Sequence, residues 1–408
     1  MQTNFTIKSQ IENTYVDKFF IFTAFLFGIA LPTSTFLLNL ALILSLICLL
    51  LTHDFKNFKD IIKNPLAFLP FFIVLALFIS LFITQNDNGI DIVSKYKKLL
   101  YIAPLSLFFL YKKSLPEIFI NGFQVANLVI LITSIVMYAF GISAGTGTPE
   151  NPTVFKLHLT QNFFMAIAAV IWLVKAKYQE NNINRYIFIF IAFLAIYNIF
   201  FLIAGRTGYL ALLTALFTYS IFSFKFRKTM ILFICMLIFS SVLIKMNATP
   251  VQKIMQGMNE IQLYLQNDTS DENPTTSMGY RMAFTKEAIN QIKHSPIFGN
   301  GAGSFSYKGG HNPHNEYLLQ ATQLGMFGLI FFLIWMYCCY FYSIKLDNPT
   351  KIIFFIIIST YMSANMFNSF LIDASEGHFF VVVNSMIIAL TKNKCKEMKY
   401  THYKGDKH

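Results

Sequence analysis

The sequence from residue 279 to residue 328 reads GYRMAFTKEAINQIKHSPIFGNGAGSFSYKGGHNPHNEYLLQATQLGMFG. Polar residues and glycines fill most of it, and an apolar helix is expected to begin at about Glu316. Its titratable residues and glycines include Arg281, His294, His311, His314, Gly299, Gly301, Gly303, Gly309 and Gly310. Polar groups held on a loop beside a bilayer are where a membrane protein places its binding or catalytic chemistry. We therefore expect the functional site in this stretch.

The composition of the whole chain is that of a membrane protein. Of its 408 residues, 55% are hydrophobic and 13% are charged, whereas soluble domains have about 25% charged residues. A helix needs about 20 apolar residues to cross the hydrocarbon core of a bilayer. Apolar runs predict helices at 19–33, 35–52, 65–84, 96–111, 117–141, 158–175, 186–204, 207–224, 229–246, 316–343, 351–371 and 378–391. The sequence predicts an all-α polytopic membrane protein with about twelve transmembrane helices.

The spacing of the apolar runs divides the chain into four parts. We predict transmembrane helices in residues 1–246, one large loop in residues 247–315, the last transmembrane helices in residues 316–391, and a basic tail in residues 392–408. Within the loop, the residue pattern predicts an amphipathic helix at 251–266 that lies on the membrane surface, and a second short helix at 280–294.

The distribution of charge predicts the orientation of the chain. If both termini are cytoplasmic, 21 of the 32 Lys and Arg residues fall in the cytoplasmic loops and termini, as the positive-inside rule requires. The large loop then lies on the outside, which in a bacterium would be the periplasmic face of the inner membrane. The net charge of +12 follows from this topology, so we expect membrane lipids around the chain and no nucleic-acid partner.

Cysteine and glycine spacings predict neither a metal nor a cofactor. The five cysteines include no CxxC pair, so neither a disulfide framework nor a thiolate metal site is indicated. His311 and His314 form an HxxH pair in a loop without a carboxylate at metal-ligand spacing. The glycines of GNGAG (299–303) follow no strand and precede no GK[ST], so they do not predict a nucleotide-binding loop.

Two arginines are candidates for binding an anion. Arg206 opens a predicted helix at the outer membrane surface, and Arg281 lies on the predicted loop helix. Arg206 has two interpretations: it sets topology by reaching the interface, or it binds a phosphate group through bidentate hydrogen bonds. Arg281 is either solvated or the second arginine of the same anion site. Two guanidinium groups on one diphosphate would stabilise it as a leaving group.

His314 and Asn315 begin the helix that returns to the membrane. One interpretation is structural, since an asparagine at this position caps a helix N-terminus. The other is catalytic, since a neutral imidazole with a pKa near its usual value of about 6.5 can act as a general base on a hydroxyl group. His311 is a candidate partner, and Glu316 is the adjacent acidic residue.

Four further residues on the predicted outer face are candidates for substrate binding. They are Lys95, Lys98, His158 and Glu376. The two lysines belong to a cationic cluster that lies outside against the topology trend, which favours a role with a lipid phosphate. Each of the four has the alternative of being an ordinary solvated loop residue. Gly325 and Gly328 fall inside a predicted helix, where glycine allows close packing against a neighbouring helix.

Several of these motifs resemble those of the bacterial O-antigen ligase family. His314-Asn315, nine residues (316–324), and then Gly325-Met326-Phe327-Gly328 resemble its His-Asn-x9-Gly-x-x-Gly signature. The loop helix from Arg281 to Ala288, the PIFGNG turn (296–301) and GRTGYLALL (205–213) match the family in type and order. The resemblance extends over the whole architecture, with its specific motifs in 205–213 and 279–328. O-antigen polymerases and O-linked protein oligosaccharyltransferases share the large loop and are the alternatives.

The resemblance implies a metal-independent, inverting glycosyltransferase of GT-C-like fold that needs no cofactor. The donor would be a glycan on undecaprenyl diphosphate, and the acceptor a sugar of lipid A–core. His314 would be the base that activates the acceptor hydroxyl, while Arg206 and Arg281 would bind the diphosphate. Beside these three residues, our candidates for binding the substrates are His311, Asn315, Lys95, Lys98, His158 and Glu376.

A transporter of lipid-linked glycans is the main alternative from a different class of protein. Transporters often contain inverted repeats with broken helices, and no such repeat is evident in this sequence. A transporter also has no need of an external loop of about seventy residues that carries a His-Asn motif. The sequence therefore favours an enzyme, and it predicts nothing about the oligomeric state.

Overall fold

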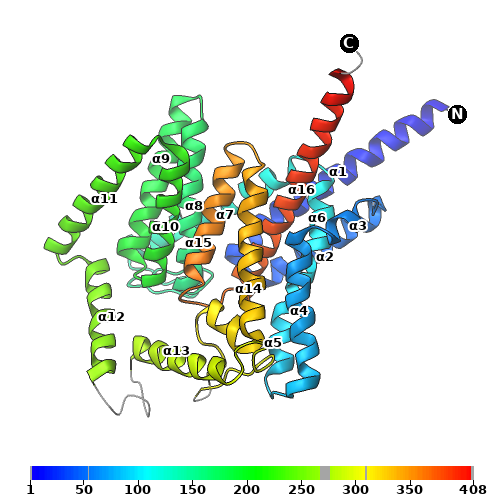
Figure 1. Ribbon diagram of the computed structural model, residues 1–408. Coiled ribbons are helices and arrows are strands. Elements are labelled where there is room, and N and C mark those ends of the chain that lie inside the picture. The colour runs from blue at the N-terminus through cyan, green and yellow to red at the C-terminus, as the bar shows by residue number, and fades with distance from the viewer. Residues whose placement is uncertain (1, 54, 267–275, 308–309, 406–408) are drawn as a thin grey trace.

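The structure, a computed structural model, describes residues 2–53, 55–266, 276–307 and 310–405 (Figure 1). Gly309, part of the predicted loop, and the last three residues of the predicted tail lie outside these ranges. The described residues form helices and no strand, apart from three isolated bridges between residue pairs.

The helices that precede the large loop occupy the first 245 of the 408 residues. They are α1 (Gln2–Thr33), α2 (Thr35–Thr52), α3 (Phe58–Ile62), α4 (Pro65–Thr84), α5 (Gly89–Tyr96), the 3-10 helix η1 (Lys97–Tyr101), α6 (Ile102–Leu110), α7 (Leu115–Phe140), α8 (His158–Tyr178), α9 (Asn182–Tyr197), the π-helix η2 (Asn198–Leu202), α10 (Arg206–Ser223) and α11 (Phe226–Lys245). The loop holds α12 (Thr249–Gln266) and α13 (Ser277–His294), and α14 (Glu316–Ile344), α15 (Thr350–Ala364) and α16 (Ala374–Gly405) follow it.

The all-α polytopic membrane architecture predicted from the sequence is confirmed. Among the described residues, nine helices are long and apolar enough to cross a bilayer. They belong to α1, α2, α4, α7, α8, α9 with η2, α11, α14 and α16. The other predicted transmembrane segments correspond to η1 with α6, to α10, and to α15, which is apolar but shorter.

The segment predicted as one helix at 96–111 is divided in the structure. It contains the end of α5, the 3-10 helix η1 and the helix α6. Pro104 is the third residue of α6. Proline has no backbone N–H and is tolerated in the first turn of a helix, where that group has no partner within the helix. The helix type therefore changes from 3-10 to α just before the proline.

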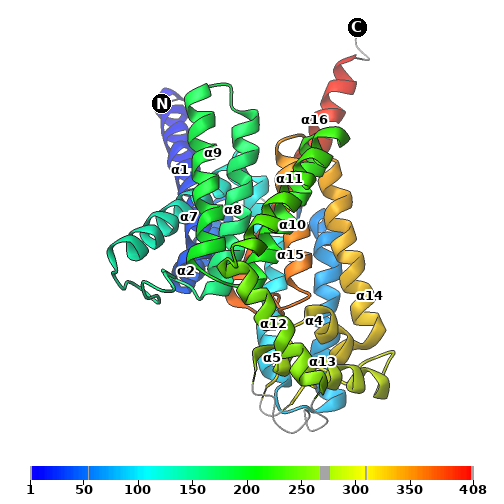
Figure 2. The same ribbon diagram turned by 90° about the vertical axis from the view of Figure 1, so that its left-hand side faces the viewer.

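Two helices form the buried centre of the bundle. Within their candidate spans, 78% of α8 and 83% of α16 is buried inside the protein, against 6% for α11. Aromatic rings join these central helices, with Phe164 of α8 meeting Phe379 of α16 at 5.3 Å between ring centroids. Buried aromatic side chains contribute strongly to packing through both area and edge-to-face geometry. Both chain ends lie at the end of the bundle opposite α13 (Figures 1 and 2).

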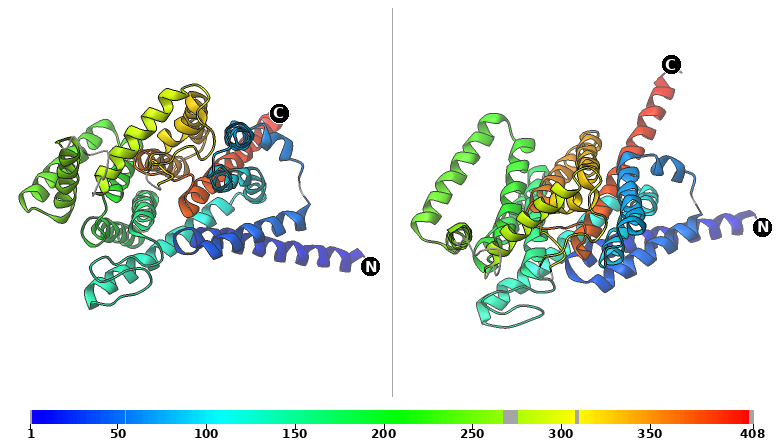
Figure 3. Two further views of the ribbon diagram at one scale, coloured as in Figure 1. Left: turned by 90° about the horizontal axis from the view of Figure 1, so that it is seen from below. Right: turned by 60° about the horizontal axis from the view of Figure 1, so that its bottom comes forward.

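The large loop covers the other end of the bundle. The two loop helices predicted at 251–266 and 280–294 are confirmed as α12 and α13. Seen from below, α13 lies across the ends of the spanning helices (Figure 3). The helix α12 packs against α13 and α10 and buries Gly257 and Glu260. Its polar face therefore belongs to the protein interior.

The prediction that Gly325 sits within a continuous helix is wrong. Its backbone has φ 63° and ψ −157°, so α14 is broken there. The segment that begins at Pro296 docks into the break, with the N–H of Met326 donating to the carbonyl of Pro296 at 2.8 Å and the N–H of Gly301 to that of Gln323 at 2.9 Å. The break thus holds the glycine-rich turn against the first half of α14. This half-helix begins directly after His314 and Asn315.

We expect Gly325→Ala to destabilise the protein by about 3 kcal/mol or more, because essentially only glycine adopts this backbone conformation. An added Cβ atom would also lie 2.3 Å from the carbonyl oxygen of Ile297. Gly141→Ala is the matched control: Gly141 has φ +65° but nothing within 4 Å of an added Cβ, so about 1 kcal/mol is expected. Unfolding in detergent measures both, and equal effects would show that the docked turn tolerates the side chain.

Candidate active site

A polar cavity of about 470 Å³ lies where the first turns of α8, α10 and α13 meet α12. We call it the arginine cavity. The residues that line it are Glu150, Asn151, His158, Leu159, Asn162, Ala204, Gly205, Arg206, Thr207, Gly208, Lys253, Gln256, Glu260, Ser277 and Arg281. Both candidate arginines and the candidate His158 are among them. The structure thus brings together three residues that are up to about 120 positions apart in the chain.

Arg206 is the first residue of α10, and Gly205 precedes it with an extended backbone. Its side chain runs towards α12 and passes over Gly257, where an added Cβ atom would lie 2.3 Å from Nη1 of Arg206. The same Nη1 atom lies 3.6 Å from Oε2 of Glu260, and it has no hydrogen-bond partner. Gly257 therefore leaves the space that the guanidinium occupies.

Glu260 connects the two loop helices to Arg206. Its carboxylate accepts hydrogen bonds from the backbone N–H of Met278 at 3.1 Å and from Nε2 of Gln256 at 2.9 Å. Since Met278 lies in the first turn of α13, the negative charge also interacts favourably with the positive end of the helix dipole. This carboxylate fixes the position of α13 relative to α12.

The sequence reasoning missed Glu260 and the other cavity residues of α12. That reasoning counted the apolar residues of 251–266 and predicted a helix on the membrane surface. The available signal was the spacing of Lys253, Gln256, Gly257 and Glu260, because residues at i, i+3, i+4 and i+7 share one face of a helix. This face forms one wall of the arginine cavity.

Arg281 lies one turn into α13 and is partly buried. Burial lowers the pKa of its guanidinium, and the positive charge of Arg206 lowers that pKa further. The guanidinium remains charged at neutral pH, because its pKa starts above 12. The two arginines also line a smaller cavity of about 140 Å³ with Thr207, Leu210, Met278 and Phe367. An anion in the arginine cavity would thus have apolar surroundings directly beside it.

His314 lies beside Arg281 but is not among the residues that line the arginine cavity. Its ring stacks on Phe284 at 5.8 Å between centroids and an interplanar angle of 24°. His314 keeps one side open to solvent, but desolvation by its neighbours lowers its pKa, and the positive charge of Arg281 lowers that pKa further. Its imidazole is therefore neutral at pH 7, which is the form that a general base needs.

The backbone of His314 is in the left-handed region, with φ 53°. A residue with a side chain pays about 1–2 kcal/mol for this conformation. The N–H of His314 donates to Oδ1 of Asn312 at 2.9 Å, and that oxygen also accepts from the hydroxyl of Ser369 at 2.7 Å. Strained backbone of this kind is concentrated at functional sites.

Asn315 caps the N-terminus of α14. Its Oδ1 atom accepts from the N–H of Leu318 at 3.1 Å, and its Nδ2 atom donates to the carbonyl of Met366 at 3.0 Å. The structural interpretation of this residue therefore holds. His311 is exposed, and its Nδ1 atom lies 3.0 Å from Nδ2 of Asn88, before α5. The structure does not place His311 among the residues that line the arginine cavity.

The remaining candidates lie outside the arginine cavity. Lys98 is 5% exposed, and its ammonium donates to the carbonyls of Ile372 at 3.2 Å and Asp373 at 2.5 Å. Lys95 forms a 2.7 Å ion pair with Asp91 on the surface of α5. Glu376 is buried in the first turn of α16. These contacts give Lys98 a role in holding the segment between α15 and α16.

No group of three or more His, Cys, Asp and Glu side chains within the described ranges is arranged to hold a metal ion. The positive charge of the cavity comes instead from Arg206, Arg281 and Lys253, and Glu150 and Glu260 offset it in part. Arginine pairs bind phosphate groups in fixed bidentate geometry. The cavity has the chemistry of a site for a phosphate or diphosphate group.

The fold and this cavity define a multi-pass membrane protein whose polar site lies at one end of a helical bundle. A family model described as O-antigen ligase matches residues 190–333, a stretch that contains Arg206, Arg281 and His314. This match supports membership of the O-antigen ligase family and, at a coarse level, a glycosyltransferase-like enzyme of the ligase or polymerase type. No curated protein matches the chain.

Proposed function

We propose that this enzyme transfers a glycan from undecaprenyl diphosphate to a sugar hydroxyl of lipid A–core. The observation that carries the proposal is that Arg206 and Arg281, from two different helices, line the same polar cavity beside an apolar one. A lipid-linked glycan donor has this combination of a diphosphate with hydrocarbon on one side and sugar on the other. In the proposed topology the site faces the periplasm and both termini are cytoplasmic.

The arginines act on the leaving group. Each guanidinium presents several N–H donors in a planar fork that fits phosphate oxygens. Breaking the bond between the anomeric carbon and the diphosphate oxygen leaves negative charge on the diphosphate. Preorganised donors at the position where charge develops stabilise the transition state. Arg206 is held by Glu260 at 3.6 Å, so its position is set before the donor binds.

His314 acts on the acceptor. Its neutral imidazole takes the proton of the acceptor hydroxyl as the oxygen attacks the anomeric carbon, and the bond to the diphosphate breaks on the opposite side. The products are the glycosylated acceptor, undecaprenyl diphosphate and a protonated His314, and the configuration of the anomeric carbon is inverted. Because His314 lies beside Arg281 and outside the cavity lining, the acceptor approaches from the side of the 310–315 segment.

The polyprenyl chain leaves the arginine cavity through the smaller cavity. Leu210, Met278 and Phe367 surround this space next to both arginines, so the first carbons of the chain have apolar neighbours. In this arrangement the charged diphosphate lies in the polar cavity at the end of the bundle. The polyprenyl chain lies in an apolar environment between helices. The energy of transfer comes from the diphosphate bond, and we propose that no metal or nucleotide takes part.

We expect Gly257→Ala to lower glycan transfer by about 10²-fold, because displacing a catalytic group by about 1 Å has an effect of this size. The new methyl group would occupy the position of Nη1 of Arg206. The fold should be retained, since alanine is about 1 kcal/mol more favourable than glycine in a helix. The exposed Asn259 of the same helix supplies the control Asn259→Ala, expected to transfer normally. Equal activity of both variants would contradict the assigned position of Arg206.

The surface lipopolysaccharide of a strain that lacks the gene tests the proposed reaction. With a ligase, the null strain shows only core bands and accumulates glycan on undecaprenyl diphosphate, the wild-type gene restores the ladder, and His314→Ala does not. Core that carries a single repeat unit would instead identify a polymerase. A normal ladder in the null strain would refute transfer to lipid A–core and direct the test to glycosylated proteins.

A further inference from the structure

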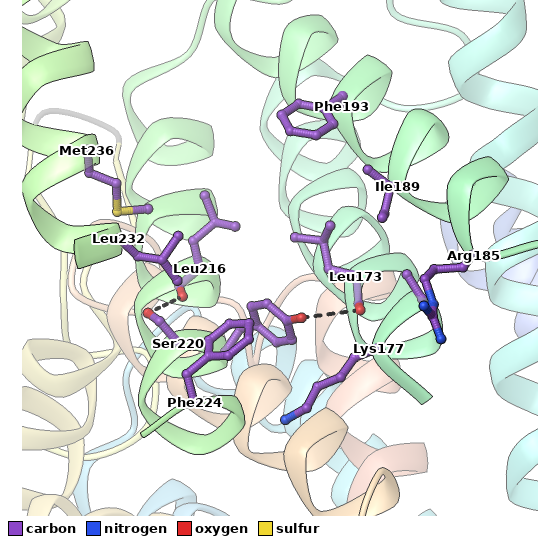
Figure 4. A pocket seen from close by; sticks show the side chains of 12 residues that line it. Leu173, Lys177, Arg185, Ile189, Phe193, Leu216, Ser220, Phe224, Leu232 and Met236 are labelled. Atoms are coloured by element: carbon purple, nitrogen blue, oxygen red, sulfur yellow. Dashed lines mark hydrogen bonds between the residues drawn. The ribbon is translucent and has the colours of Figure 1, made fainter. Parts of the chain in front are cut away.

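A second cavity lies at the end of the bundle opposite the arginine cavity. The helices α8 and α10 begin at the arginine cavity with His158 and Arg206, and they end at Tyr178 and Ser223. Near those ends, α8, α9, α10 and α11 enclose a space of about 600 Å³ (Figure 4). We call it the basic groove. It shares no lining residue with the arginine cavity.

The walls of the basic groove are apolar. They are formed by Leu173, Ala176, Ile189, Phe193, Leu216, Tyr219, Ser220, Phe224, Leu232 and Met236. The two hydroxyl groups in this wall already donate to backbone carbonyls, Tyr219 to Leu173 at 3.3 Å and Ser220 to Leu216 at 2.8 Å (Figure 4). The interior of the groove therefore suits a hydrocarbon chain and offers little to a polar molecule.

Two cations, Lys177 and Arg185, complete the lining, and no Asp or Glu is part of it. The ammonium of Lys177 donates to the carbonyl of Ser223, and Nη2 of Arg185 donates to the carbonyl of Gln179 at 2.9 Å. An ammonium has three N–H donors and a guanidinium has five. Both groups thus keep donors for a further acceptor while their positions are fixed.

The fourth wall, α11, leaves the groove accessible from the membrane. Only 6% of its span is buried inside the protein, and α11 lies at the outer edge of the bundle (Figure 1). Its side chains Leu232 and Met236 reach the groove, while Ile231 and Ile234 are exposed. A helix with this exposure faces bilayer lipid along most of its surface, so lipid is the molecule with direct access to the space behind it.

We propose that the basic groove binds an anionic glycerophospholipid of the leaflet at that end of the bundle. One acyl chain lies between α9, α10 and α11, and the phosphate group binds to Lys177 and Arg185. The apolar wall fits the hydrocarbon of a lipid. The two fixed cations, with no carboxylate in the lining, fit its anionic headgroup. The bound lipid fills the space between α11 and the bundle and links α11 to α8 and α9. This binding is separate from the proposed glycan transfer.

Native mass spectrometry of the full-length protein in detergent tests the proposal. The lipids compared are phosphatidylglycerol and phosphatidylcholine with the same acyl chains. We expect the wild type to bind one phosphatidylglycerol at least tenfold more tightly than phosphatidylcholine. The Lys177→Gln, Arg185→Gln double variant should lose this preference. Leu216→Trp, which fills the apolar part of the groove, should weaken binding of phosphatidylglycerol while both cations remain.

Matched controls separate this site from general attraction of anionic lipid to a basic surface. Lys59 and Lys63 are exposed and lie on or next to α3, away from the groove, so Lys59→Gln, Lys63→Gln should bind phosphatidylglycerol as the wild type does. Equal loss in both double variants would overturn the proposal. So would unchanged binding in Leu216→Trp, or equal binding of glycerol phosphate, which has no acyl chain. If the mass spectra show lipid-free dimers in place of the lipid-bound protein, a second copy of the chain covers the groove and the proposal is overturned.

Discussion

We expect His314→Asn to lower the rate of glycan transfer by about 10²–10⁴-fold, the usual contribution of a general base. Asparagine is chosen because it tolerates the left-handed backbone that His314 adopts, with φ 53°. The variant therefore removes the base without adding strain to the 310–315 segment. Purified enzyme with a lipid-linked glycan donor and a lipid A–core acceptor provides the measurement.

Donor binding distinguishes a catalytic from a structural role of His314. The variant should bind the donor as the wild type does, because the imidazole stacks on Phe284 and does not line the arginine cavity. His311→Ala is the matched control, since His311 lies in the same segment but contacts Asn88 instead of Phe284, and it should retain nearly full activity. A large loss of donor affinity in His314→Asn would mean that His314 only supports the loop.

The pH dependence of the reaction should follow the same histidine. Desolvation and Arg281 lower the pKa of His314 below its usual value of 6.5, so the basic form predominates over a wider range than for a free histidine. We expect kcat/KM to fall as pH drops through this lowered pKa, with a midpoint below pH 6.5, because protonation removes the base. A profile with its midpoint above pH 6.5 would contradict the assignment of His314 as the base.

The sequence predicted those parts of this protein that depend on local composition. Long apolar runs locate membrane helices because the hydrocarbon core sets their length, and helices near 251–266 and 280–294 follow from residue pattern and turn signals. The candidate residues Arg206, Arg281 and His158 were selected because polar and charged groups at the membrane surface are often functional. The structure brings these three together in one cavity.

The features that the sequence did not predict depend on contacts between distant segments. Lys98 was expected either to bind a lipid phosphate or to be solvated, but it is buried and its ammonium donates to carbonyls about 275 positions away in the chain. Gly325 was assigned to close helix packing. Its positive φ could not be predicted, because the break in α14 depends on the docked 296–301 segment. Glu260 was missed because its partners Arg206 and Met278 come from other helices. Local periodicity could place Glu260 on the polar face of its own helix, but it contains no information about which distant residues that face contacts.

We expect Arg206→Ala to lower glycan transfer by about 10²–10³-fold, as the loss of one preorganised donor to a developing charge does. Arg206→Lys should restore little, because an ammonium cannot make the bidentate contact of a guanidinium. The affinity for the donor should fall as well, which distinguishes these variants from His314→Asn. A label-free binding assay with the lipid-linked donor, together with the transfer assay, measures both quantities.

Glu260 makes the effect of Arg206 larger than the loss of a single donor. Once Arg206 is removed, the carboxylate of Glu260, which lies 3.6 Å from its guanidinium, stays in the cavity without that partner and repels the diphosphate. Glu260→Gln keeps an acceptor for the N–H of Met278 but removes the charge. The double variant Arg206→Ala, Glu260→Gln should therefore bind the donor about tenfold better than Arg206→Ala, whereas Glu260→Gln alone changes binding little. Strictly additive effects in this cycle would show that Glu260 does not act on the anion site through its charge.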